Sequence, residues 1–338
     1  MRIITQLGLA LGLLLLISLL IWQGVLDVIK LLIESGWNLL WLPLIWLPNF
    51  LPATEGWRLV FSNNQKPSFY HALLAMWMGR AVNNMLPVAS IGGEIVKARL
   101  VNFWGIPGIN AAASVMVDKV AQAMSVAAWG LIGVCLLVYL TADQKLALYA
   151  FAGFMLLAMC AIGFLYVQKK GLLGSLATLG GKLIKTDSWE GITFSAREID
   201  AVIHDTYHHK ARFFLAVTLR TLGLIIQTTE VWLACILFGH PIGLLEAIML
   251  KSLTTTLSDV AFIIPNAYGI QEGAFIMVGA LVGLPPDVAL AISLAIRIRD
   301  VLLDPAGLLT LHQIEAKEFF RKKDLRKPGN TDQDVVTD

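Results

Sequence analysis

The stretch VAQAMSVAAWGLIGVCLLVYLTA, from Val120 to Ala142, holds 23 residues without one charged side chain. An α-helix needs about 20 predominantly apolar residues to cross a hydrocarbon core of roughly 30 Å. Comparable uncharged runs extend over 3–26, 35–54 and 146–168. The whole chain is 57% hydrophobic and 15% charged, whereas soluble domains carry about 25% charged residues. The sequence therefore predicts an all-α polytopic membrane protein.

Two further apolar segments, at about 69–104 and 241–284, are interrupted by Pro and Gly. Lipid cannot satisfy irregular backbone, so such segments must be buried in protein or line a cavity. We interpret both as broken or re-entrant helical hairpins within one transmembrane domain that covers 1–315. Six full spans are expected beside them, at roughly 4–25, 36–60, 108–140, 146–168, 212–238 and 286–311.

Lysine and arginine are concentrated in two hydrophilic regions. The loop 168–212 carries seven of them and the tail 316–338 carries six, whereas 239–296 carries only Lys251. Positive charge marks the cytoplasmic side of a membrane protein. We therefore expect the loop, the tail and both termini to be cytoplasmic.

The two broken segments match each other when the chain is compared with itself at an offset of 178 residues. An odd number of spans, three, separates the copies, which inverts the second relative to the first. This pattern predicts an inverted-topology repeat with half-repeats around 69–120 and 241–300, and substrate sites of such transporters lie where the interrupted helices meet. The matching pairs are Pro87 with Pro265, Ala89 with Ala267, Glu94 with Glu272, Gly105 with Gly283, Pro107 with Pro285 and Lys119 with Arg297.

Each broken segment combines a helix breaker with polar groups. Proline removes a backbone donor, and glycine permits close approach of another group. The helix ends freed in this way offer N–H groups that suit an anionic head group. The alternative is that the same residues form a kink that serves only packing, with its polar groups buried as helix caps. The candidate residues are Arg80, Asn83, Asn84, Pro87, Gly92, Gly93, Glu94, Lys97 and Arg99 in the first segment, and Pro265, Gly269 and Glu272 in the second.

Charged residues also occur inside the expected spans. One charge at mid-membrane costs about 2.5–3.5 kcal/mol on insertion scales, so the whole set must pair or face a cavity. Helical spacing places the charges of each span on one face. They serve either a substrate pathway or structural ion pairing, and they are Asp118, Lys119, Arg220, Glu230, Arg297, Arg299, Asp300 and Asp304.

The sequence offers little evidence for a cofactor site or a metal site. The stretch His204-Asp205-Thr206-Tyr207-His208 resembles a zinc motif, but it lies in the basic loop, where an interfacial amphipathic helix is expected. The three cysteines lie singly in apolar runs. With a net charge of only +2 the chain lacks the basic signature of a nucleic-acid binder. We expect no cofactor, no metal site and no nucleic-acid partner.

From Leu86 to Val96 the sequence resembles the lysylphosphatidylglycerol synthase transmembrane-region family, also called flippase-like membrane proteins. The resemblance continues through 111–117, 265–286 and 296–309, and covers about residues 5–315. Within the family it is closest to the hopanoid-biosynthesis-associated subgroup. The second copy departs from the usual Pro-Gly-Gly pattern, because Pro265-Asn266-Ala267 stands there.

The resemblance implies a lipid flippase or transporter in the bacterial inner membrane, with membrane lipids as its partners. The substrate that the resemblance implies is a phospholipid or a hopanoid-type lipid. Two alternatives stay open. A membrane-embedded lipid-modifying transferase would need an acid–base pair, for which Glu94 with Asp118 is the candidate, although no catalytic motif is visible. A non-catalytic partner of lipid-biosynthesis enzymes would need no transport pathway.

Overall fold

The computed structural model describes residues 2–23, 25–61, 65–86, 92–141, 187–260 and 264–325, with short pieces between 148 and 166. Throughout these residues the chain is helical and forms no strand. In chain order the helices are α1 (Arg2–Gln23), α2 (Val25–Ser35), η1 (Gly36–Leu40), α3 (Trp41–Trp46), η2 (Leu47–Asn49), α4 (Phe50–Leu59), α5 (Phe69–Met85), α6 (Gly92–Phe103), α7 (Gly108–Thr141), α10 (Asp187–His208), α11 (Lys210–Leu237), α12 (Leu244–Val260), η4 (Pro265–Ala267), α13 (Ile270–Leu281) and α14 (Pro286–Leu325).

Three helical stretches of the described chain are long and apolar enough to cross a membrane: Val28–Leu59, Gly108–Thr141 and Lys210–Leu237. They include the expected spans 36–60, 108–140 and 212–238. α14 contains the expected span 286–311, but its apolar half also carries charges. The expected span 146–168 lies mostly outside the described residues. The chain is therefore a helical membrane protein.

The expected span 36–60 is not one regular helix. It passes through η1, α3, η2 and α4 in turn. Pro43, Pro48 and Pro52 explain the interruptions, because proline lacks the N–H that a continuous helix needs and clashes with the preceding turn. This broken span packs along α11, where Gly56 and Gly223 let the two backbones approach closely.

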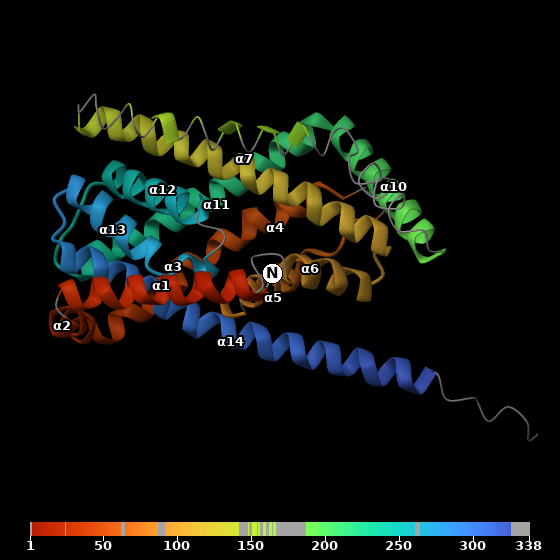
Figure 1. Cartoon of the computed structure of the whole chain (residues 1–338), viewed down its shortest axis with the longest axis horizontal. Coiled ribbons are helices and arrows are strands. Elements are labelled where there is room, and N and C mark those ends of the chain that lie inside the picture. The colour runs from red at the N-terminus through yellow and green to blue at the C-terminus, as the bar shows by residue number, and fades with distance from the viewer. Residues whose placement is uncertain are drawn as a thin grey trace, which may run out of the picture.

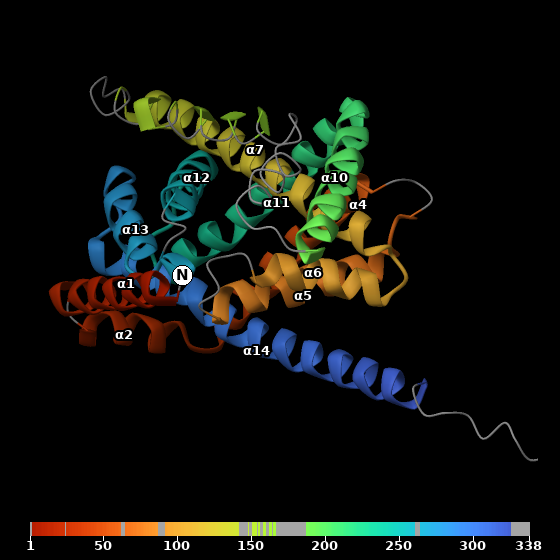
Figure 2. The same cartoon turned by 45° about the vertical axis from the view of Figure 1, so that its right-hand side comes forward.

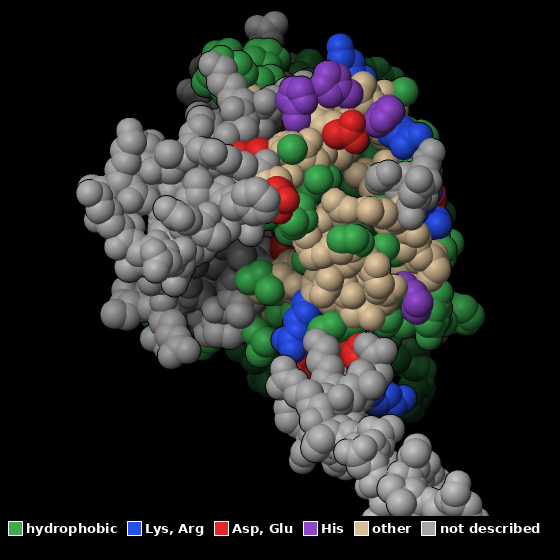
Figure 3. Space-filling view, turned by 90° about the vertical axis from the view of Figure 1, so that its right-hand side faces the viewer, with side chains coloured by type: hydrophobic (Ala, Val, Ile, Leu, Met, Phe, Trp, Pro, Cys, Tyr) green, Lys and Arg blue, Asp and Glu red, His purple; other side chains and the backbone are tan. Residues whose placement is uncertain are grey.

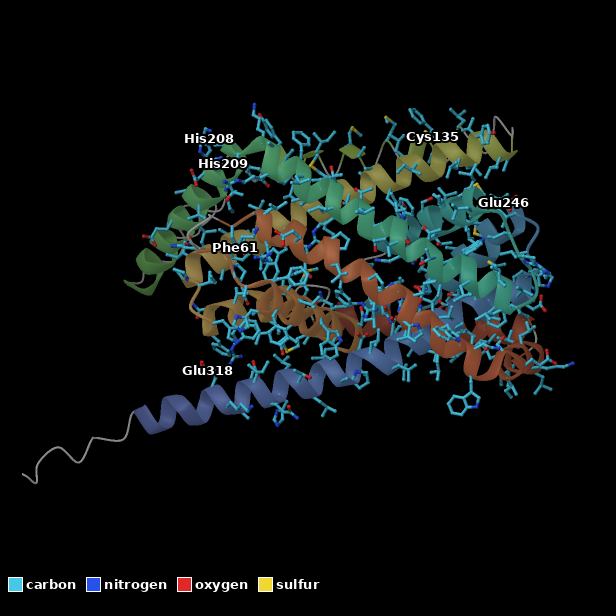
Figure 4. The ribbon with its side chains drawn as sticks, turned by 180° about the vertical axis from the view of Figure 1, so that it is seen from behind. Phe61, Cys135, His208, His209, Glu246 and Glu318 are labelled. Atoms are coloured by element: carbon cyan, nitrogen blue, oxygen red, sulfur yellow. The ribbon has the colours of Figure 1, made fainter. Side chains whose placement is uncertain are left out.

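The long helices run along the length of the molecule, and the short helices α6 and α13 lie near its opposite ends (Figures 1 and 2). α10 lies at the same end as α6. Figure 4 places Phe61, His208 and His209 at this end, and Cys135 and Glu246 toward the other. Figure 3 looks onto the α10 end and shows Lys, Arg and His side chains there.

Helix boundaries recur at the offset of 178 residues. α6 and α13 begin and end 178 residues apart, as do the first residues of α7 and α14 and the last residues of α4 and α11. Gly105 and Gly283, which precede α7 and α14, both adopt positive φ, at 97° and 77°. Glycine occupies both positions because other residues rarely adopt this conformation. α5 and α12 are offset by 175 instead.

Two apolar cores stabilise the bundle. The first surrounds Trp57 and Leu100 and joins α4, α5, α6 and the start of α7 to α10. The second surrounds Leu250, Phe275 and Leu290 and joins α11, α12, α13 and the start of α14. Each core therefore belongs mainly to one of the two offset segments, and polar side chains gather between them.

Candidate functional site

A cavity of about 370 Å³ lies between the two cores. Its walls come from the broken span and from α5, α6, α7, α11, α12 and α14. Five of its lining residues are basic and two are acidic, within a chain of apolar helices. The charged lining residues are Arg80, Glu94, Lys97, Lys119, Arg220, Asp259 and Arg299, and the polar ones are Asn49, Asn83, Asn84, Gln122, Ser125, Gln227 and Thr255.

Asp118 on α7 organises the first group of charges. Its carboxylate is 2% exposed and accepts hydrogen bonds from Lys97 Nζ at 2.7 Å and from Arg220 Nη2 at 2.5 Å. Lys97 also contacts Glu94 at 3.0 Å, and Glu94 contacts Lys119 at 2.8 Å. The consecutive helices α6 and α7 are thereby joined to the distant helix α11 through alternating charges.

The packing of α5 against α6 sets the position of this group. Asn83 Oδ1 accepts a hydrogen bond from Gly93 N at 2.8 Å. A Cβ on Gly93 would lie 2.0 Å from the carbonyl oxygen of Gly79, so only glycine allows the two helices to pack this closely. The glycines of the first segment are therefore explained by packing. Gly92 begins α6 beside them, whereas Pro87 lies outside the described residues.

A second group of charges joins α5, α11 and α14. Arg80 contacts Asp300 and Asp304, each at 2.5 Å, and Asn84 donates to Asp304 at 2.9 Å. Arg299 contacts Asp300 at 2.7 Å and the fully buried Glu230 at 2.5 Å. The indole of Trp46 lies close to both guanidinium groups, with its ring centroid 4.5 Å from Arg80 Cζ and 4.2 Å from Arg299 Cζ.

A third group lies apart from the cavity lining. Glu272 forms an ion pair with Arg297 and accepts a hydrogen bond from Gly269 N at 2.7 Å. Arg297 also stands 4.4 Å from the ring centroid of Tyr268. Pro265 opens the adjoining turn η4, in which Asn266 has a φ of 51°.

The sequence predicts that ten polar residues converge on one cavity between the two halves, and the structure brings together only part of this set. The ten are Arg80, Asn83, Glu94, Lys97, Asp118, Arg220, Glu230, Glu272, Arg297 and Asp300. The first group lines the cavity or stands directly behind it, and the second group reaches it through Arg80 and Arg299. Glu272 and Arg297 are absent from the lining. Arg99 forms a half-exposed ion pair with Glu315 at 2.9 Å, also away from the cavity.

The histidine motif forms a close pair instead of a larger cluster. His208 Nε2 lies 3.2 Å from His204 Nδ1 on the exposed side of α10. Across the described residues, no group of three or more His, Cys, Asp or Glu side chains could hold a metal ion.

Several lining residues are missing from the set expected from sequence. Asp259 and Thr255 stand one turn apart on α12, and Trp46 stands on the broken span. The i, i+4 spacing of Lys251, Thr255 and Asp259 is the signal that could have revealed the α12 face. Trp46 has no such signal, because tryptophan is common in membrane spans.

Two further lining residues contact each other from opposite halves. Gln227 Nε2 donates to Asn49 Oδ1 at 3.2 Å, and the two positions are 178 residues apart. Residues related by a two-fold axis can touch each other only where they lie close to that axis. The contact therefore marks the place where such an axis would cross the cavity.

Comparison with known families gives one match. The family model described as "Lysylphosphatidylglycerol synthase TM region" matches residues 7–304. Comparison with curated proteins and with solved structures found no match.

Proposed function

Because the chain belongs to the lysylphosphatidylglycerol synthase transmembrane-region family, whose name links it to lipid metabolism, we propose that it moves a lipid across the bilayer through the cavity between its two cores. The match covers most of the chain. It extends from α1 to the charged part of α14, so it includes every residue that lines the cavity.

The observation that carries the proposal is the charge of the cavity lining. Arg80, Lys97, Lys119, Arg220 and Arg299 all line it, whereas most of the carboxylates that pair with them stand behind. Small-molecule sites have volumes of roughly 300–1,000 Å³, and the cavity, at about 370 Å³, is at the small end of this range. A lipid head group with a phosphate fits this charge, while the acyl or polycyclic part stays in the membrane.

Ion-pair exchange supplies a physical route for the head group. A phosphate that enters can replace a carboxylate as the partner of a guanidinium group, so that no cation is left bare in a medium of low dielectric constant. Arg80 and Arg299 suit this role because each contacts more than one carboxylate. Losing one contact still leaves the cation paired.

We propose that the two halves form an inverted-topology repeat with both termini in the cytoplasm of a bacterial cell. The shared helix boundaries, the contact between Asn49 and Gln227 and the placement of α6 and α13 at opposite ends support this arrangement. The resemblance to the hopanoid-associated subgroup makes a hopanoid, beside phospholipids, the lipid to test. It also makes lipid-biosynthesis enzymes the partners to test.

The acid–base pair of the enzyme alternative, Glu94 with Asp118, is engaged in this structure. Both carboxylates contact the amino group of Lys97, at 3.0 and 2.7 Å. A carboxylate held in this way must first give up its contact with the cation before it can act on a substrate, which leaves a buried charge uncompensated. This arrangement favours transport over catalysis by this pair.

The experiment is lipid movement in vesicles that contain the purified protein, followed by quenching of fluorescent phospholipids and by exchange of a radiolabelled hopanoid. We expect Arg80→Ala to lower the rate at least tenfold with protein recovery unchanged. Lys30→Ala, which removes an exposed ion pair with Glu34, is the control and should keep the wild-type rate. Wild-type transport by Arg80→Ala would show that this charge only holds helices together.

A further inference from the structure

The two halves contain the same ion pair in different settings. Glu94 and Lys119 are in contact at 2.8 Å, and the residues 178 positions later, Glu272 and Arg297, are also in contact. In each half the acidic residue lies near the start of the short helix, and the basic residue lies on the long helix that follows. The pairing is therefore a property of the repeated unit.

The first pair is open to the cavity. The Lys119 side chain is 32% exposed and that of Glu94 is 14% exposed, and both line the cavity. Lys119 also contacts Gln122 at 3.1 Å. A head group in the cavity can therefore reach this pair directly.

The second pair is closed. Glu272 is fully buried, and its carboxylate also accepts from Gly269 N and from the hydroxyl of Ser293. Arg297 donates to the carbonyl oxygens of Asn266 at 3.3 Å and Ala267 at 3.5 Å. The Glu272 carboxylate is thus closed to a ligand in the observed conformation, and the Arg297 side chain, at 11% exposed, lies outside the cavity lining.

An inverted repeat can explain why two equivalent ion pairs have different conformations. If the two halves exchange conformations, the closed site opens at one face while the open site closes at the other. From this asymmetry we infer that Glu272 and Arg297 form a second head-group site, held closed by its own ion pair. The inference rests on the proposed transport function, and it adds a head-group binding site at the opposite face of the membrane.

The side chains around the second pair fit an anionic head group. When Glu272 moves away, the guanidinium of Arg297 is left with donors that bind a phosphate in two-point fashion. Gln271 donates to Ser293 Oγ at 2.9 Å, so an amide and a hydroxyl stand beside the same place. The second site therefore takes the same class of ligand as the first.

The test uses labelling of single cysteines in nanodiscs, with the three native cysteines replaced by alanine. Ser293→Cys reports on the second site and Gln122→Cys reports on the cavity. We expect Glu272→Gln and Arg297→Met each to raise the labelling rate of Ser293→Cys tenfold or more, and to lower the labelling rate of Gln122→Cys.

A second labelling experiment, with an added ligand, distinguishes opening of the second site from binding of a head group there. Glycerol phosphate should protect Ser293→Cys from labelling in the Glu272→Gln background, where the guanidinium of Arg297 is free, and should not protect it in Arg297→Met. Lys30→Met, at an exposed surface pair, is the control for loss of a charge and should leave both reporters unchanged.

Three results would overturn the inference: unchanged labelling of Ser293→Cys, faster labelling of both reporters, or no protection in either background. If the single variants aggregate, the pair Glu272→Lys with Arg297→Glu retains opposite charges and should keep Ser293→Cys unreactive; rapid labelling there would also overturn it. Cysteine labelling does not require lipid movement. The labelling test therefore still gives a result if the transport assay shows no activity.

Discussion

Asparagine in place of Asp118 removes the negative charge that two buried cations share, while it keeps the size and shape of the side chain. In the native protein the carboxylate is 2% exposed and contacts both Lys97 and Arg220. The substitution tests how much of the stability of the bundle depends on this link between α6, α7 and α11.

The expected loss follows from the contacts that remain. Removal of one partner from a buried ion pair costs about 3–5 kcal/mol, because a charge is left buried and uncompensated. Lys97 retains Glu94 at 3.0 Å and stands 4.7 Å from the ring centroid of Trp57. Arg220 has no other carboxylate partner among the described residues, so we expect at least the lower end of the range, about 3 kcal/mol, which is roughly a hundredfold change in the folding equilibrium.

The assay is denaturant titration in mixed micelles, with the free energy of unfolding compared across a double-mutant cycle. Asp118→Asn combined with Arg220→Gln should cost less than the sum of the single changes, with a coupling of about 1–3 kcal/mol. Glu34→Gln, at a surface pair, should cost about 0.5 kcal/mol or less. A cost for Asp118→Asn as small as that of this control, or strict additivity in the cycle, would refute the reasoning.

Two more outcomes follow from the packing. Gly93→Ala should sharply lower the yield of folded protein, because its methyl group would meet the carbonyl oxygen of Gly79 at 2.0 Å; Gly153→Ala, with open space around it, should give the native yield in the same gel-filtration assay. Gln227→Leu should slow lipid movement in vesicles while melting within a few degrees of the native protein, because it leaves Asn49 without this partner in the cavity lining; unchanged transport would show that the contact is incidental.

The helical membrane class and the offset between the two segments can both be predicted from the sequence, because both depend on residue types at fixed spacing. Uncharged runs indicate membrane-spanning helices, and the match of Glu94 with Glu272 indicates the offset at which helix boundaries recur. Lys119 matches Arg297 at the same offset, and the structure adds that each of them contacts the acidic residue of its own segment, Glu94 or Glu272.

The arrangement of charges in space could not be read in the same way. Sequence places Glu272 and Arg99 with the other pathway residues, because nothing in their spacing tells an open pair from a closed or exposed one. Asp259 is missed for a related reason, since it stands at the end of α12 among few other charges. Which charges share a cavity depends on helix packing, and that packing joins residues more than one hundred positions apart.

The long sequence separation of these ion pairs has a consequence for synthesis of the protein. Arg80 is translated 220 residues before Asp300 and 224 before Asp304, and at about 5–20 residues per second this interval lasts roughly 10–45 s. During that time an inserted α5 would hold an unpaired cation at a cost of about 2.5–3.5 kcal/mol. The nascent α5–α6 hairpin should therefore wait at the membrane surface or beside an insertase, and enter fully only when α14 arrives with the two aspartates.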